Sequence, residues 1–271
     1  MDYQEFIWQK IKPLKRLGDL KNPPQKLYVS GRPDPKIFEN CTAIVGSRRM
    51  TDYGRGAIEK IVPQLVGQGI TVVSGFMYGV DQYAHQTTLE CGGKTIAVLG
   101  WGIDGKLSGQ DKEMADQIIK CGGLILSEWQ SQVPTLWTFP KRNRIVAALC
   151  QEVIIVEAAE KSGSLITAKI AGELGRKVFS VPGPITSRAS QGTNTLIAKG
   201  EAAVWQGQFE KSKRTDSDPL LAALEDQPQS ANELSRKLDI SISELGAKLS
   251  LLSLSGQVKE RNGKYCLADA G

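Results

Sequence analysis

Histidine, paired cysteines and long apolar runs are scarce or missing in this sequence. The 271 residues include one histidine, His85, and five cysteines, none of them in a Cys-x-x-Cys pair. This spacing excludes the usual disulfide frameworks and zinc sites, so we expect buried thiols and no metal. No apolar stretch approaches the roughly 20 residues that a membrane span needs, and polar residues follow Met1. The sequence therefore predicts a cytoplasmic protein without a membrane anchor.

The common nucleotide-binding motifs are not found in the arrangement that binding requires. The turn after the first predicted strand lacks Gly-x-Gly-x-x-Gly, and Ser74-Gly75 stands where a ribose-binding acid would be expected. Gly93-Lys94-Thr95 has Thr88 in place of the first glycine of a P-loop. Dinucleotide-dependent and ATP-hydrolysing enzymes are therefore disfavoured, and we expect no cofactor. His85 has no nucleophile beside it in the sequence, so we assign no catalytic residue.

Short β-branched runs alternate with helical patterns between residues 41 and 205. The runs are nearly continuous in apolar residues, without in-and-out alternation, as in parallel strands covered on both faces. They are 42–45, 70–73, 95–99, 124–126, 153–156 and 177–181. The sequence predicts an α/β fold, an extended Rossmann-like doubly wound and mostly parallel sheet, with a small C-terminal winged-helix domain.

The pattern divides the chain into four parts. We expect an N-terminal extension (1–40), the Rossmann-like domain (41–205), a polar linker (206–218) and the winged-helix domain (219–271). In the last part, Ser230 and Glu233 form a capping box, and Asn262-Gly263 is a hairpin signal. This part is either a DNA or protein contact module or a small helical appendage for dimer or partner contacts.

The first predicted strand runs into a loop that contains Gly46, Ser47, Arg48 and Arg49. Ligands of such sheets bind at this carboxyl edge. Backbone amides at the following helix start and the guanidinium of Arg48 suit a phosphate. The alternative is that Arg48 only braces the loop through a carboxylate.

Cations and an aromatic ring gather at the start of a later helix. The segment contains Phe139, Lys141, Arg142, Asn143 and Arg144. Cations at a helix start oppose the helix dipole, which suggests an anionic partner, and the ring offers a face for a nucleobase. The alternative places Phe139 in the core and Arg144 in an ion pair with Glu128 or Glu157.

A further small-residue loop feeds a helix at Ser162, Gly163 and Ser164. Its amides can take a second phosphate or cap the helix unaided. Asp81, in the first turn of another helix, is as well explained by the helix dipole as by binding.

Many of these motifs together resemble the DNA-processing protein A (DprA, or Smf) family. The motifs are Ile44–Arg48, Val73–Gly75, Gly79–Asp81, Ala84-His85, Ser127-Glu128, Phe139-Pro140, Arg142–Arg144, Val156–Ala158, Ser162–Ala168, Val181–Gly183, Gly192 and Asn194. The resemblance covers about 27–205. It departs at 105–112, where the family has Tyr-Pro-x-x-Asn, so either Lys106 or Lys112 is the candidate DNA contact there.

The resemblance implies a homodimer that holds single-stranded DNA in a basic pocket without strong sequence preference. It implies displacement of single-strand binding protein and loading of the RecA recombinase during natural transformation. Arg48 matches the family's DNA-contacting arginine, and Phe139, Lys141 and Arg142 lie on its pocket-forming segment. The net charge of +5 permits this but does not decide it.

Two rival functions stay open at this stage. A nucleotide-processing enzyme of the phosphoribohydrolase type shares the fold class, but that group has Pro-Gly-Gly-x-Gly-Thr where this chain has Pro182-Gly183-Pro184. An interaction scaffold would use the basic rim to bind an acidic protein.

Overall fold

The computed structural model describes residues 2–206, 219–224, 229–254, 258–261 and 263–267. Contacts divide the chain into two compact units, 1–208 and 209–271. The predicted linker lies outside the described residues except for Gln206. No helix within the described residues is long and apolar enough to cross a membrane.

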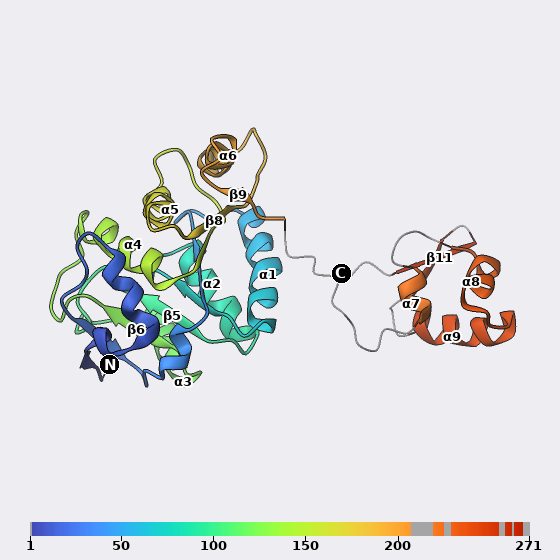
Figure 1. The fold of residues 1–271 in the computed structure, drawn as a ribbon, viewed down its shortest axis with the longest axis horizontal. Helices are drawn as coiled ribbons and strands as arrows, with labels where there is room; N and C mark the ends of the chain where they lie inside the picture. The colour runs from blue at the N-terminus through green and yellow to red at the C-terminus, as the bar shows by residue number, and fades with distance from the viewer. Residues whose placement is uncertain (1, 207–218, 225–228, 255–257, 262, 268–271) are drawn as a thin grey trace. The chain divides into compact units, whose positions relative to one another are not determined.

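The first unit is a doubly wound sheet (Figure 1). Its described strands follow the order β1-β2-β6-β5-β4-β3-β7-β8-β9. The strands are β1 Gln4–Phe6, β2 Leu27–Ser30, β3 Cys41–Val45, β4 Thr71–Ser74, β5 Thr95–Val98, β6 Leu124–Ser127, β7 Glu152–Ile155, β8 Lys177–Ser180 and β9 Ala203–Val204. In the stretch β6-β5-β4-β3-β7-β8-β9 of this order, every pair of neighbouring strands is parallel, which confirms the predicted sheet.

Six α-helices of this unit are described. They are α1 Asp52–Gly67, α2 Val80–Glu90, α3 Gly109–Lys120, α4 Thr138–Leu149, α5 Gly163–Glu173 and α6 Gln191–Ala198. Short 3-10 helices are η1 Trp8–Lys10, η2 Lys12–Asp19, η3 Pro35–Phe38 and η4 Arg188–Ser190. The side chain of Thr51 caps α1, and Pro140 is tolerated because it lies in the first turn of α4.

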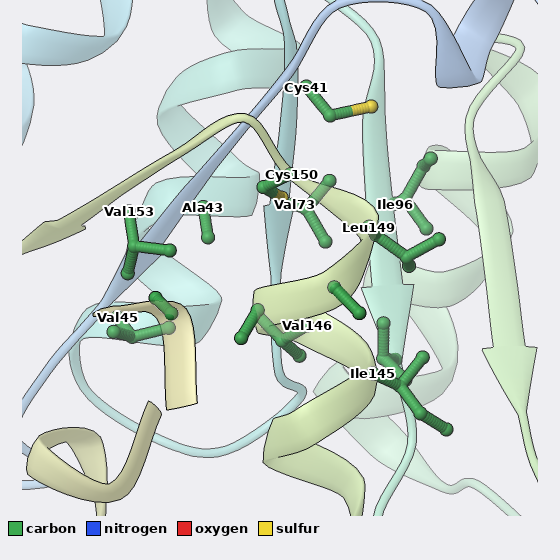
Figure 2. Close-up of a cluster of buried hydrophobic side chains, with 14 of the residues drawn as sticks. Cys41, Ala43, Val45, Val73, Ile96, Ile145, Val146, Leu149, Cys150 and Val153 are labelled. Carbon is green, nitrogen blue, oxygen red and sulfur yellow. The ribbon is translucent and has the colours of Figure 1, made fainter. Parts of the chain in front are cut away.

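The two faces of the sheet bury separate sets of side chains. Ile44 faces α1 and α2, whereas its neighbours Ala43 and Val45 face α4, as strand alternation requires. Figure 2 shows Ile145, Val146 and Leu149 of α4 among the side chains of this second face. Strands covered on both sides explain the continuous apolar runs of the sequence.

Residues 1–40, set apart as an extension in the sequence analysis, supply two strands of the sheet. Strand β2 pairs antiparallel with β6, and β1 pairs with β2. Helix η2 buries Leu14 and Leu17 in the core beneath α4. The segment is therefore part of the first unit rather than separate from it.

The expectation of buried thiols is correct for some cysteines and wrong for others. Cys41 and Cys150 are buried, and burial raises the pKa of Cys41 to about 12. Cys91 and Cys121 are exposed, because each lies in the solvent-facing turn that ends α2 or α3.

In the described residues of the second unit, three helices are followed by a hairpin. These are α7 Pro219–Ala223, α8 Ala231–Leu238, α9 Ile242–Leu254, β10 Val258–Arg261 and β11 Lys264–Leu267. Ser230 and Glu233 form the predicted capping box. At the end of the hairpin, Arg261 of β10 pairs with Lys264 of β11, and Gly263 between them has a φ of +75°. Asn262, the other residue of the predicted turn, lies outside the described residues.

Candidate functional site

A cleft of about 650 Å³ opens at the carboxyl ends of β3, β4 and β7. The chain leaves β3 toward β4 on one side, whereas β7 pairs with β3 on the other side. Such a reversal of strand order leaves a crevice between the outgoing loops, where open α/β sheets bind ligands. We call this cavity the switch-point cleft. It is lined by Val45–Arg49, Gly75, Met77, Tyr78, Asp81, Leu136, Phe139, Pro140, Arg142, Asn143, Val146, Ala159 and Lys161–Ser164, with Thr167.

The loop after β3 is held by a buried acid. The carboxylate of Glu157 accepts hydrogen bonds from both the backbone amide and the hydroxyl of Thr51, which caps α1. A side chain at Gly46 would come within 2.9 Å of the Glu157 carbonyl oxygen, so only glycine allows this approach. The loop is therefore fixed before any ligand arrives.

Arg48 and Arg49 are exposed at the rim of the cleft. The guanidinium carbon of Arg48 lies 4.8 Å from the centre of the Phe139 ring, a cation–π contact. Neither arginine forms an ion pair within the described residues. The carboxylate partner of the alternative interpretation is therefore not found there, and both cations can take an anion.

Arg142 lies beneath the cleft in a buried pair. Its guanidinium is 3.9 Å from the carboxylate of Asp81, and it donates a hydrogen bond to the carbonyl of Val98. Burial lowers the pKa of Arg142 and raises the pKa of Asp81, because both charges are removed from water. The neighbouring Gly75 leaves no room for a side chain, because its first carbon would collide with the Asp81 carboxylate and the Arg142 guanidinium. Arg142 thus forms the floor of the cleft.

The start of α5 forms the opposite wall. Ser162 caps the helix by accepting from the amide of Ser164, and the two hydroxyls lie 2.8 Å apart. The side-chain amide of Asn143 donates a hydrogen bond to the backbone carbonyl of Gly163 at 3.1 Å, which connects α4 to this loop. Ser162, Gly163, Ser164 and Asn143 thus meet at the cleft, as the sequence predicted.

The remaining predicted residues lie outside the cleft. Lys141 places its ammonium over the rings of Trp129 and Trp137, at 5.5 and 5.6 Å. Arg144 is largely buried in an ion pair with Glu128, which is the pairing that the alternative interpretation proposed. A direct ligand contact by Arg144 would require this pair to separate.

The two candidate lysines of residues 105–112, the segment that differs from the family pattern, lie in different places. Lys112 pairs with Asp116 on the surface of α3, at 2.9 Å, and lines none of the cavities at this edge. Lys106 lines a second hollow that adjoins the cleft. Of the two candidates, Lys106 is therefore the one near the site.

Lys161 and Tyr78 line the cleft but were not among the predicted residues. Lys161 directly precedes the predicted loop at 162–164, so its position beside that loop was a usable signal. Tyr78 is 64% exposed between two glycines, and no pattern in the sequence indicated which way its ring points.

His85 is a structural residue. It is fully buried, and its ring nitrogens contact the Thr95 hydroxyl at 2.6 Å and the Gly75 carbonyl at 2.7 Å. Because the Gly75 carbonyl only accepts, Nε2 donates to it. The Thr95 hydroxyl also lies 2.8 Å from the carbonyl of Val72, so the Val72 oxygen competes with Nδ1 for the single hydroxyl proton. Burial lowers the pKa of His85 to about 4.

We expect acid to destabilise the fold through His85. Between pH 6.5 and about 4, the unfolded chain binds a proton that the folded chain does not, so stability falls as pH falls. The loss is about 1.4 kcal/mol per pH unit, or roughly 2 kcal/mol between pH 6.5 and 5. Urea unfolding at several pH values tests this, with His85→Gln as the matched variant, since glutamine can donate and accept in the same places. An equal pH dependence in both proteins would contradict the assignment.

Comparison with known proteins matches both units. The family described as DNA recombination-mediator protein A matches residues 7–214, and the DprA winged helix domain matches residues 210–264. Protein Smf of Synechocystis is 39% identical over 207 residues, which are 75% of this chain and 49% of that protein. DNA processing protein DprA of Streptococcus pneumoniae is 40% identical over 193 residues, covering 71% of this chain and 67% of that protein. The chain thus spans about half to two thirds of these relatives.

Two solved structures share the fold at higher than 30% identity. The X-ray structure of DNA processing protein A from Streptococcus pneumoniae has a TM-score of 0.67 and 37% identity, covering 75% of this chain and 71% of that one. A structure of the Helicobacter pylori protein, described for its single-stranded DNA binding mode, has a TM-score of 0.66 and 32% identity. It covers 76% of this chain and 92% of that one.

Proposed function

Since the chain belongs to the DNA recombination-mediator protein A family, we propose that it binds single-stranded DNA through the switch-point cleft, without strong sequence preference, and loads the RecA recombinase onto the strand during DNA uptake. The observation that carries the DNA step is the position of Arg48, which is exposed over the Phe139 ring at the cleft and forms no ion pair with any described residue. A phosphate and a base are adjacent in every nucleotide, and this pair of side chains offers a site for each.

The electrostatics of the cleft support a strand rather than a neutral ligand. Four cations line it, Arg48, Arg49, Arg142 and Lys161, against one acid, Asp81, which is already paired with Arg142. Three cations thus remain for phosphates. The Ser162 to Ser164 turn at the start of α5 adds backbone dipoles of the same sign.

The enzymatic alternative would need a free acid in the cleft. The carboxylate of Glu157, at the same edge of the sheet, has both oxygens bound by Thr51. Asp81 is occupied by Arg142. Glu157 and Asp81 therefore act as braces, which supports a binding protein without turnover.

The partners proposed from the family are RecA, single-strand binding protein and a second copy of the chain. In this proposal the cleft takes a strand from single-strand binding protein and presents it to RecA, and the homodimer offers two clefts. The winged-helix unit is proposed as a further contact module, for DNA or protein.

Fluorescence anisotropy with labelled oligo-dT and a matched duplex tests the DNA step. We expect tighter binding of the single strand, because an unstacked base can reach the Phe139 ring only when it is unpaired. Equal or tighter binding of the duplex would contradict the proposal. Binding of neither would remove DNA as the ligand and leave an acidic protein to be tested.

A further inference from the structure

A second hollow of about 620 Å³ adjoins the switch-point cleft. The two share Met77, Tyr78 and Phe139, so Phe139 forms the wall between them. We call the second hollow the aromatic pocket. It is lined by Phe76–Tyr78, Gln82, Trp101, Asp104–Ser108, Asp111, Ser131–Pro134 and Phe139.

The walls of the aromatic pocket are fixed by backbone hydrogen bonds between two loops. The amides of Gly102, Ile103 and Asp104 donate to carbonyls of residues 132, 129 and 130, at 2.9, 2.9 and 3.2 Å. A side chain at Gly102 would come within 2.4 Å of the Gln132 amide, so glycine permits this contact. The pocket is therefore formed in advance, which lowers the ordering cost of binding.

Aromatic rings supply the apolar part of this pocket. The ring centres of Phe76 and Trp101 lie 6.4 Å apart, as do those of Trp101 and Phe139, and Tyr78 is exposed at the mouth. Concave sites with aromatic walls and a few polar groups suit flat ligands. A nucleobase is the flat part of a strand whose phosphates occupy the neighbouring cleft.

The charge of the pocket is opposite to that of the cleft. Its charged side chains are Asp104, Asp111 and Lys106, two acids against one cation. Ser131 donates to Asp104, and Gln82 donates to Asp111 at 2.7 Å, which positions both carboxylates. Each carboxylate keeps further acceptor sites, since two oxygens accept about four hydrogen bonds. These acids repel a phosphate and accept from an amino group.

We infer that the aromatic pocket takes one nucleobase of the bound strand and favours bases with an exocyclic amino group. Cytosine presents an N4 amino donor, which carboxylates accept, whereas thymine presents a carbonyl oxygen in that place. The inference rests on the proposed function, because the strand reaches the pocket from the cleft. It adds a modest chemical preference at one position of the strand.

The test compares oligo-dC with oligo-dT of equal length by anisotropy at neutral pH. For the unaltered protein we expect about fivefold tighter binding of oligo-dC, as one net hydrogen bond gives. Asp104→Ala should bring the ratio of the two affinities close to one. Asp116→Ala is the matched control, since Asp116 has the same charge and lies on the surface of α3 outside both cavities.

The ratio separates this inference from the proposed function. A ratio above one that falls in Asp104→Ala but not in Asp116→Ala supports the pocket. Equal affinities in the unaltered protein, or a ratio that Asp104→Ala leaves unchanged, overturn the inference while strand binding through Arg48 stands. Binding of neither oligonucleotide overturns both.

Discussion

Replacing Arg48 by alanine is expected to lower the affinity for oligo-dT roughly 10- to 100-fold, the effect of losing one hydrogen-bonded charge contact of about 1.5–3 kcal/mol. The side chain is exposed at the cleft, and its contact with the Phe139 ring is the cation–π pair described above. The fold should be unaffected, because no ion pair within the described residues involves Arg48. Anisotropy gives the affinity, and thermal unfolding confirms that the variant is intact.

Two further variants make the Arg48 result specific. Arg48→Lys keeps the charge but loses the planar fork, so we expect an intermediate affinity. Lys177→Ala removes the same charge at the first residue of β8. This residue lies at the amino ends of the strands, away from the cleft, so the variant should bind almost as the unaltered protein does. If Arg48→Ala binds as tightly as Lys177→Ala, the strand does not use this arginine.

Replacing Arg142 by methionine is expected to cost about 3–5 kcal/mol of unfolding free energy, as breaking a buried ion pair from one side does. The change leaves the Asp81 carboxylate buried without its cation and leaves the Val98 carbonyl without its donor. The effect arises in the floor of the cleft rather than in a ligand contact. Urea unfolding at neutral pH measures it.

A double variant tests the cause of this loss. Asp81→Asn together with Arg142→Met removes the orphaned charge, while the amide oxygen still accepts from the Met77 backbone. We expect the double variant to recover a large part of the stability lost in Arg142→Met. An Arg142→Met protein that is as stable as the unaltered one but binds oligo-dT weakly would show instead that the guanidinium reaches the strand.

The central sheet could be predicted from the sequence because its strands are covered on both faces. Runs such as Ala43–Val45 and Val153–Val156 are apolar at every position, as is typical of a parallel strand buried on both faces. Strand β2 could not be predicted in the same way. Its place next to β6 depends on a long-range antiparallel pairing that four residues do not encode locally.

The site was predictable where it depends on strand order and not where it depends on partners. Gly46 to Arg49 and Ser162 to Ser164 follow strands that are neighbours in the sheet, so their convergence followed from topology. Whether Arg142 and Arg144 are free to contact a ligand depends on their ion pairs with Asp81 and Glu128. These acids come close to the arginines only after folding. The three cations are adjacent in the sequence but have different surroundings. Arg142 forms the floor of the cleft, Arg144 is in an ion pair, and Lys141 contacts aromatic rings.

The dependence of oligo-dT affinity on salt tests most directly whether the cleft neutralises phosphates. Each phosphate neutralised on a single strand contributes a slope of about −0.7 to the log–log plot of affinity against salt concentration. Arg48, Arg49 and Lys161 are the cleft cations without an acidic partner in the described part of the chain. Changing all three to alanine should therefore make the slope less steep by roughly 2. An unchanged slope in this variant would mean that the phosphates are neutralised elsewhere and would contradict the assignment of the cleft.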